Sequence, residues 1–294
     1  MANNLTKQIE TLQQRSNSQL LLHLNQLTAP KVLKEAIRYS ILGEGKRVRP
    51  ILTYLVTDML GENIKHADKA AVSIELIHNY SLIHDDLPAM DDDDMRRGEL
   101  SCHKKFNEPI AILAGDAIQA FAFEILAKAN DLSHSTRNAL ITELAKAIGA
   151  SGMVGGQVLD LSYQNKKIQL KDIAYMHSLK TGALIRSSVR MGALIAGADP
   201  LTLSLISDFG NTLGLIFQIR DDILDATADE ATIGKPKGSD KKKGKATYVT
   251  ILGEKEATRR LNEQRNIARD LAAELGPDGA VLEELSFFLA TRKR

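Results

Sequence analysis

The spacing of the prolines restricts this chain to a narrow class of folds. Only seven prolines occur in 294 residues, and none lies between Pro109 and Pro200. Proline disrupts the interior of a helix but is tolerated in its first turn, so this long interval is free to be helical. Apolar residues recur at intervals of three and four, as in Val72, Leu76, Ile77, Tyr80, Ile83 and Leu87. Because aromatic residues are only 4% and tryptophan is absent, strands are disfavoured and an all-α protein is predicted.

The same periodicity places the helices along the chain. They are expected over 3–24, 31–42, 50–60, 66–87, 109–129, 135–150, 170–196, 201–227, 245–275 and 279–290. No linker rich in Pro, Gly or Ser and no internal repeat divides the sequence. Residues 1–294 are therefore predicted to form a single large helical domain.

Composition narrows the class of protein further. Hydrophobic residues make up 44% and charged residues 26%, which is typical of a globular chain. A membrane span needs about 18 consecutive apolar residues, and neither such a run nor a secretory signal is recognised. The single cysteine, Cys102, cannot form an internal disulfide, which favours the reducing cytoplasm. A net charge of +1 provides no field that would attract nucleic acid.

Two aspartate-rich segments each lie at the end of a strongly apolar predicted helix. Residues 85–94 read DDLPAMDDDD and residues 221–225 read DDILD. An acidic run alone is usually a solvated surface segment. Here each run begins at the end of a helix expected in the bundle interior, and Asp221 and Asp225 share one helix face. Clustered carboxylates with few His or Cys nearby suit hard cations, above all Mg²⁺.

Basic residues accompany both acidic segments. The sequence GKRVRP (45–50) stands at the start of a predicted helix, where backbone amides and the helix dipole favour anions. Arg96 and Arg97 follow the first acidic run, lysines between 235 and 245 follow the second, and Lys180 lies where a glycine predicts a kink. A lone lysine is usually a solvated surface charge, but together these residues predict a site for a Mg²⁺-bound diphosphate. A Walker-type phosphate loop is absent, so nucleotide hydrolysis is not expected.

Five motifs resemble those of the trans-polyprenyl diphosphate synthases, in the same order and spacing. They are GKRVRP (45–50), YSLIHDDLPAMDDDDMRRG (80–98), GGQVLDL (155–161), KTGALIR (180–186) and FQIRDDILD (217–225). The resemblance covers essentially the whole chain and is strongest to the bacterial type of farnesyl diphosphate synthase. It implies an all-α isoprenoid synthase fold, a helical bundle around a central cavity, a homodimer and three Mg²⁺ ions.

The resemblance also implies roles for individual residues. The implied Mg²⁺ ligands are Asp85, Asp86, Asp91, Asp221, Asp222 and Asp225, with Asp92, Asp93 and Asp94 peripheral. The implied isopentenyl diphosphate site comprises Lys46, Arg49, His78 and Arg97. The residues implied to hold the allylic diphosphate or to line the reacting carbons are Arg96, Lys180, Thr181, Gln218 and Lys235. Those expected to be catalytic are Asp85, Asp86, Asp91, Lys180, Thr181, Gln218 and Asp221.

Product length is expected to depend on Tyr80 and Ser81, the residues five and four before Asp85. By its spacing alone Tyr80 could equally be an ordinary core aromatic. Without the motif, His78 would be interpreted as an ordinary core histidine. The basic C-terminal residues 291–294 resemble a tail that closes over the homoallylic diphosphate, with a frayed charged end as the alternative.

The resemblance implies a cytoplasmic prenyltransferase that condenses isopentenyl diphosphate with dimethylallyl and then geranyl diphosphate, giving (2E,6E)-farnesyl diphosphate. A geranylgeranyl or geranyl diphosphate synthase is the alternative within the family. A metal-dependent helical phosphohydrolase using His78, His84, Asp85 and His103 is a distant alternative, as is an acidic cation-binding scaffold. The phosphohydrolase alternative gives no role to the second aspartate-rich segment or to residues 46–49.

Overall fold

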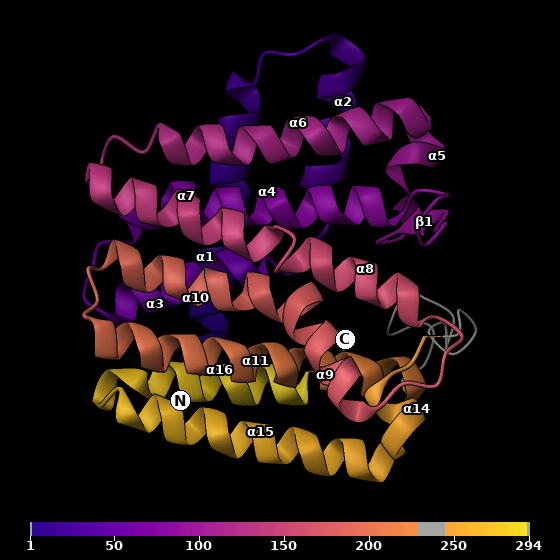
Figure 1. Cartoon of the computed structure of the whole chain (residues 1–294). Helices are drawn as coiled ribbons and strands as arrows, with labels where there is room; N and C mark the ends of the chain where they lie inside the picture. Colours follow the sequence, from indigo (N-terminus) through magenta and orange to yellow (C-terminus); the bar gives the residue numbers. More distant parts are fainter. Residues whose placement is uncertain (1, 228–244, 293–294) are drawn as a thin grey trace. The chain divides into compact units, whose positions relative to one another are not determined.

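The computed structural model describes residues 2–227 and 245–292, and within them the all-α prediction is confirmed (Figure 1). The chain divides into two compact units. One comprises Thr6–Ile141, here called the N-terminal unit. The other comprises Thr142–Arg294 with Met1–Leu5, here called the C-terminal unit. That the two form one functional domain over 1–294 stays a prediction.

The N-terminal unit is built around the pairing of α4 with α6. Its elements are most of α1 (Ala2–Gln26), α2 (Lys31–Leu42), α3 (Val48–Met59), η1 (Ile64–Ala67), α4 (Asp68–Asp85), β1 (Met95–Arg96), β2 (Glu99–Leu100), α5 (Cys102–Phe106), α6 (Glu108–Ala127) and most of α7 (His134–Ile148). Helix α4 is buried along most of its length and runs beside α6 (Figure 1). Gly115 of α6 permits this approach, because a Cβ there would lie 2.1 Å from Nε2 of His84.

The C-terminal unit is built around α11. Its elements after α7 are α8 (Met153–Tyr163), α9 (Leu170–His177), η2 (Ser178–Gly182), α10 (Ala183–Ile195), α11 (Pro200–Thr227), α14 (Tyr248–Leu252), α15 (Glu254–Glu274), η3 (Pro277–Gly279) and α16 (Ala280–Thr291). Helix α11 packs extensively against both α10 and α15 (Figure 1). Phe209, Leu213 and Ile216 are fully buried along it, as the spacing of its apolar residues predicts.

Several local elements differ from the expectation. Helix α8 was not predicted, because Gly155 and Gly156 weaken the helical signal, and the predicted helix 245–275 is two helices that meet at Gly253 (φ 79°). At Lys180, where a kink is predicted, the chain forms a turn of π-helix, η2. The strands β1 and β2 were missed, since a two-residue turn joins such short strands.

Helix α6 is long and apolar enough, by length and composition alone, to cross a membrane. The best window has a mean hydropathy of 1.7, and 39% of it is buried. A single helix of this kind is weak evidence, because a core helix of a protein in water passes the same test. Glu108, Asp116 and Glu124 add carboxylates along its length.

Candidate functional site

The first aspartate-rich segment folds back on the end of α4. Asp85 is the last residue of the helix, and the backbone N–H of Asp91 donates to its carbonyl oxygen at 2.9 Å. The N–H of Asp92 donates to the carbonyl of Leu87 at 3.2 Å, which closes the same turn. The six-residue separation in sequence thus becomes a direct backbone contact. The turn brings together Asp85 and Asp91, two of the predicted metal ligands.

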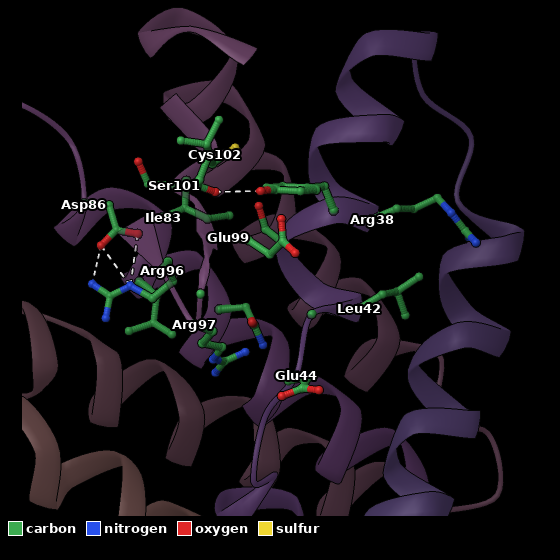
Figure 2. Close-up of a pocket in the computed structure, with 17 residues that line it drawn as sticks. Arg38, Leu42, Glu44, Ile83, Asp86, Arg96, Arg97, Glu99, Ser101 and Cys102 are labelled. Atoms are coloured by element: carbon green, nitrogen blue, oxygen red, sulfur yellow. Dashed lines mark hydrogen bonds and ion pairs between the residues drawn. The ribbon is translucent and has the colours of Figure 1, made fainter. Parts of the chain in front are cut away.

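Asp86, a third predicted ligand, is buried and paired with Arg96. The Arg96 Nε donates to Oδ1 at 3.0 Å and to Oδ2 at 3.1 Å, and a terminal nitrogen also contacts Oδ1 (Figure 2). Burial lowers the pKa of Arg96, but the hydrogen bond and the charge of Asp86 outweigh it and leave the pKa raised. A predicted metal ligand and a predicted substrate ligand are therefore partners of one another. Such a bidentate pair fixes the position of both groups.

Four arginines lie near enough to the predicted substrate residue His78 to act on its charge. The pKa of His78 lies well below its usual value, first because of burial and then because of Arg49, Arg97, Arg96 and Arg47. The imidazole is therefore neutral at physiological pH. Of the four residues predicted to hold isopentenyl diphosphate, Arg49, His78 and Arg97 thus share one basic neighbourhood. Lys46 is exposed on the turn directly before α3.

Arg47, the residue between Lys46 and Val48, is turned inward, which the sequence did not indicate. It has φ 51°, and its side chain is 2% exposed. Its guanidinium donates to Glu75 Oε1 at 2.8 Å and also to the carbonyls of Ile41 and Gly43. The GKRVRP segment therefore combines a buried structural arginine with the residues predicted to bind anions.

A cavity of about 700 Å³ lies beside this basic neighbourhood within the N-terminal unit. Charged side chains of both signs line it, namely Arg38, Glu44, Asp86, Arg96, Arg97 and Glu99 (Figure 2). The buried residue Cys102 also lines it. Figure 2 shows the Asp86–Arg96 pair among the residues that line the cavity, and Asp86 directly follows α4. The predicted diphosphate residues Arg96 and Arg97 are therefore reachable by a small molecule in this cavity.

The remaining acidic residues of the first segment form a separate group. Oxygen or nitrogen atoms of Asp92, Asp94 and His103 lie within 4.8 Å of one another, close enough to share a cation. Lys104 Nζ already lies 2.8 Å from Asp94, so this group is partly neutralised. His84, in contrast, turns toward α6, where its Nε2 lies 3.1 Å from the carbonyl of Ile112. The histidine set required by the hydrolase alternative gains no support from these contacts.

Tyr80 and Ser81, the predicted determinants of product length, are both on α4. Tyr80 is 6% exposed, and its ring meets that of His84 edge-on with centroids 5.6 Å apart. The Ser81 hydroxyl donates to the carbonyl of His78 at 2.9 Å. Their role in product length stays a prediction.

The second aspartate-rich segment ends α11, and a C-terminal arginine rests on it. Asp221 is 42% exposed, and Arg292 donates to its Oδ1 at 2.5 Å. The Arg292 guanidinium also lies 4.0 Å from the centroid of the Phe217 ring, and Arg220 donates to the Arg292 carbonyl at 2.8 Å. A positive group is therefore held at a carboxylate predicted to bind Mg²⁺. Lys293 and Arg294 lie outside the described residues.

Thr181, Gln218 and Asp222 form one hydrogen-bonded chain. The Thr181 hydroxyl donates to Gln218 Oε1 at 3.1 Å, and Gln218 Nε2 donates to Asp222 Oδ1 at 2.8 Å. Asp222 is 2% exposed, and its Oδ2 accepts the backbone N–H of Tyr248 at 2.7 Å. The structure thus brings together three predicted site residues that are up to 41 positions apart in the printed sequence. It also adds Tyr248, which the sequence did not indicate.

Lys180 donates to Asp160 Oδ2 at 2.6 Å, and Lys245 lies 3.8 Å from the same oxygen. Asp160 belongs to the GGQVLDL motif but carried no predicted role. The predicted ligand Lys235 lies outside the described residues. Asp225 is partly exposed on α11, one turn after Asp221.

The carboxylates differ in how well they fit Mg²⁺. Asp85 and Asp91 are brought together by a turn, and Asp221 is exposed with a guanidinium already at one oxygen. Oxygen donors of this kind suit Mg²⁺, which keeps part of its water shell. Asp86 and Asp222 each accept protein donors on both oxygens, so those donors would compete with an ion.

Comparison with known proteins agrees with this arrangement. Residues 30–279 match the model of the family described as polyprenyl synthetase. The farnesyl diphosphate synthase of Escherichia coli (strain K12) is 44% identical over 266 residues, 88% of this chain and 89% of that protein. Geranylgeranyl pyrophosphate synthase 4 of Arabidopsis thaliana is 41% identical over 247 residues, 83% and 66% of the two chains.

The fold is also similar to that of solved prenyltransferase structures. The crystal structure of a geranyltransferase from Legionella pneumophila matches with a TM-score of 0.89 at 36% identity, covering 99% of this chain and 98% of that one. The fold is thus that of the prenyltransferases, as the resemblance implied, and the family match covers both aspartate-rich segments and the basic motif at 45–50. The chain belongs to the polyprenyl synthetase family.

Proposed function

We propose that this prenyltransferase condenses isopentenyl diphosphate with dimethylallyl and then geranyl diphosphate, and that its product is (2E,6E)-farnesyl diphosphate. The observation that carries the proposal is the basic neighbourhood around His78, because one of its arginines, Arg96, is bonded to Asp86 at the end of α4. The identity to the farnesyl diphosphate synthase of Escherichia coli supports the fifteen-carbon product. The geranylgeranyl synthase relative keeps a twenty-carbon product as the second candidate.

The proposed reaction breaks the allylic carbon–oxygen bond, and the electron pair leaves with the diphosphate. The double bond of isopentenyl diphosphate then supplies the electrons for the new carbon–carbon bond. The proton lost in restoring a double bond passes to the departing diphosphate, so no side-chain base is required. Arginine and lysine stabilise the charge that grows on the leaving group.

Different side chains are proposed to bind the two substrates. Arg49, Arg97 and the neutral His78 would hold isopentenyl diphosphate, while Arg96 and Lys180 would hold the allylic diphosphate. The Thr181–Gln218 pair would face the allylic cation with oxygen atoms that are weak nucleophiles.

We propose that Asp85, Asp91 and Asp221 hold Mg²⁺, with Asp225 beside Asp221. Bound Mg²⁺ would neutralise the diphosphate as a Lewis acid. Asp86 and Asp222 are proposed to act mainly by fixing Arg96 and Gln218, the residues to which they are bonded. We also propose that each site binds three Mg²⁺ ions, as the resemblance to the family implies.

We also propose that the two units act as one domain and that the protein is a cytoplasmic homodimer. Ile112 and Leu113 of α6 are 43% and 53% exposed, and an exposed apolar face of this kind favours pairing with a second copy. Sedimentation at micromolar protein tests the dimer, and a monomer there would contradict it.

The proposal is tested by supplying labelled isopentenyl diphosphate with each allylic primer and separating the dephosphorylated products. We expect diphosphate release only when both substrates and Mg²⁺ are present. Release from a single phosphate ester would instead indicate a hydrolase, and no release would indicate a binding protein.

Replacing Arg49 with alanine is expected to separate the two substrate sites. A lost charge-assisted contact costs about 1.5–3 kcal/mol, so the KM for isopentenyl diphosphate should rise roughly 10- to 100-fold. The KM for the allylic substrate should change far less. Steady-state kinetics with each substrate varied in turn measures both values, and a rise confined to the allylic KM would contradict the assignment of GKRVRP.

Replacing Tyr80 with alanine is expected to lengthen the product. Five residues before Asp85, Tyr80 lies about 7.5 Å along α4, the direction in which the hydrocarbon chain is proposed to extend. Another five-carbon unit could gain about 4 kcal/mol on burial, so only steric exclusion would stop growth. We expect geranylgeranyl or longer products by chromatography. An active variant that still ends at fifteen carbons would remove Tyr80 as the determinant.

A further inference from the structure

Two lysines share one carboxylate oxygen at the end of α8. Lys180 Nζ donates to Asp160 Oδ2 at 2.6 Å, and Lys245 Nζ lies 3.8 Å from the same atom. The three side chains are shielded, with exposures of 21% for Lys180, 15% for Lys245 and 10% for Asp160. Ammonium groups brought this close repel each other, and the repulsion is strong where water is scarce. The shared carboxylate is the group that offsets it.

The backbone of α8 is placed so that Asp160 can reach both lysines. Gly156 lies one helical turn before Asp160, on the same face of α8. A Cβ at Gly156 would lie 2.2 Å from the backbone nitrogen of Lys180, so only glycine permits this contact between α8 and η2. Two residues of the GGQVLDL motif thus act together, since Gly156 allows α8 to approach η2 and Asp160 bonds to Lys180.

The neighbouring titratable groups leave the charge of this cluster unchanged near neutral pH. The ring of His177 stacks on that of Tyr248 with centroids 5.9 Å apart. Burial lowers the pKa of His177 to about 4, and burial raises the pKa of Tyr248. Both groups are therefore neutral at pH 7. Among the residues that the structure describes, these contacts join two ammonium groups to one carboxylate.

We propose that Asp160 is a positioning residue that holds the ammonium groups of Lys180 and Lys245 together as a single anchor for the allylic diphosphate. The inference rests on the proposed function. Lysine carries its charge on a flexible stem, and a fixed partner reduces the ordering needed when an anion binds. Asp160 itself repels an anion, so its contribution comes entirely through the two lysines.

The decisive variant is Asp160→Asn, which keeps the shape and removes the charge. We expect the KM for the allylic diphosphate to rise roughly 10- to 100-fold, while the KM for isopentenyl diphosphate stays unchanged. Asp160→Glu, which restores the charge, should recover part of the loss. Asp208→Asn removes an exposed carboxylate from α11 and serves as the matched control. An allylic KM that is unchanged or lower in Asp160→Asn overturns the inference, because Asp160 would then act only by repulsion.

A second variant keeps the test decisive if Asp160→Asn does not fold. Lys245→Met leaves the Asp160–Lys180 pair intact, so folding should be retained, and the allylic KM should again rise about tenfold. An unchanged KM there overturns the shared anchor. In the double variant Asp160→Asn/Lys245→Met, the rise in the allylic KM should be smaller than the product of the two single rises, because Asp160 acts through Lys245.

Calorimetric binding of inorganic diphosphate separates this inference from the proposed function. Wild-type protein is expected to bind diphosphate about tenfold more tightly than Asp160→Asn, as a lost charge-assisted contact implies. That result without chain elongation by the wild type would overturn the proposed function and support the role of Asp160. Equal affinities with normal elongation would overturn the inference alone.

Discussion

Asp85→Ala and Asp221→Ala are each expected to lower turnover at least about a hundredfold. Each variant removes a carboxylate proposed to hold Mg²⁺, and the lost stabilisation of the leaving group is worth several kcal/mol. Every ~1.4 kcal/mol of lost stabilisation lowers the rate by a factor of ten. The effect should appear in kcat at saturating substrates. Steady-state rates at a range of Mg²⁺ concentrations measure it.

Folding should survive both substitutions, since removing one carboxylate from an acidic segment relieves repulsion. Asp208→Ala, on the exposed face of α11, is the matched control and should retain wild-type turnover. The Asp221 variant also loses the contact with Arg292, so circular dichroism and the melting temperature should be recorded for it. Near-normal turnover in both variants at saturating Mg²⁺ would contradict the proposed ionisation of the allylic diphosphate.

Arg47→Met is expected to produce the largest loss of stability. Its guanidinium and the Glu75 carboxylate are each 2% exposed and 2.8 Å apart. Removing one partner leaves the other charge buried, which typically costs about 3–5 kcal/mol in the free energy of unfolding. Asn17 and the carbonyls of Ile41 and Gly43 would lose their donor as well. Denaturant unfolding followed by circular dichroism measures the change.

The double variant Arg47→Met/Glu75→Leu tests whether the loss of stability comes from leaving one charge buried without its partner. Replacing both charges with apolar groups of similar size is often close to neutral, so most of the stability should return. Lys31→Met, at a side chain that is 91% exposed, is the surface control and should change the free energy of unfolding by about 0.5 kcal/mol or less. An Arg47→Met variant as stable as wild type would show that the buried pair contributes nothing net.

The helices could be predicted because their signals are local. Apolar spacing in α4 and α11 depends on residues three and four apart, and the prolines mark where helices begin. Helix α8 was missed for the opposite reason. Gly156 weakens the helix locally and is required by its contact with Lys180, which is remote in sequence.

The candidate site could be predicted only as a set of residue types. The aspartates after α4 and α11, with arginines at 49, 96 and 97, already indicate a Mg²⁺-dependent diphosphate site. Adjacent aspartates look equivalent in the sequence. In the structure Asp85 contacts Asp91 through the backbone, whereas Asp86 next to it is buried against Arg96.

By itself, the sequence determined the helical class, the resemblance to the synthase family and the positions of the charged motifs. Each of these depends on the spacing of residues that lie close together along the chain. Only the tertiary structure decided which charges are buried in ion pairs and which are exposed. In the structure Arg47 forms a buried ion pair with Glu75, whereas Lys46 is exposed. Asp160 forms ion pairs with two lysines. The physical reason is that the role of a charge depends on its partner and its burial, and folding brings those partners from distant parts of the chain.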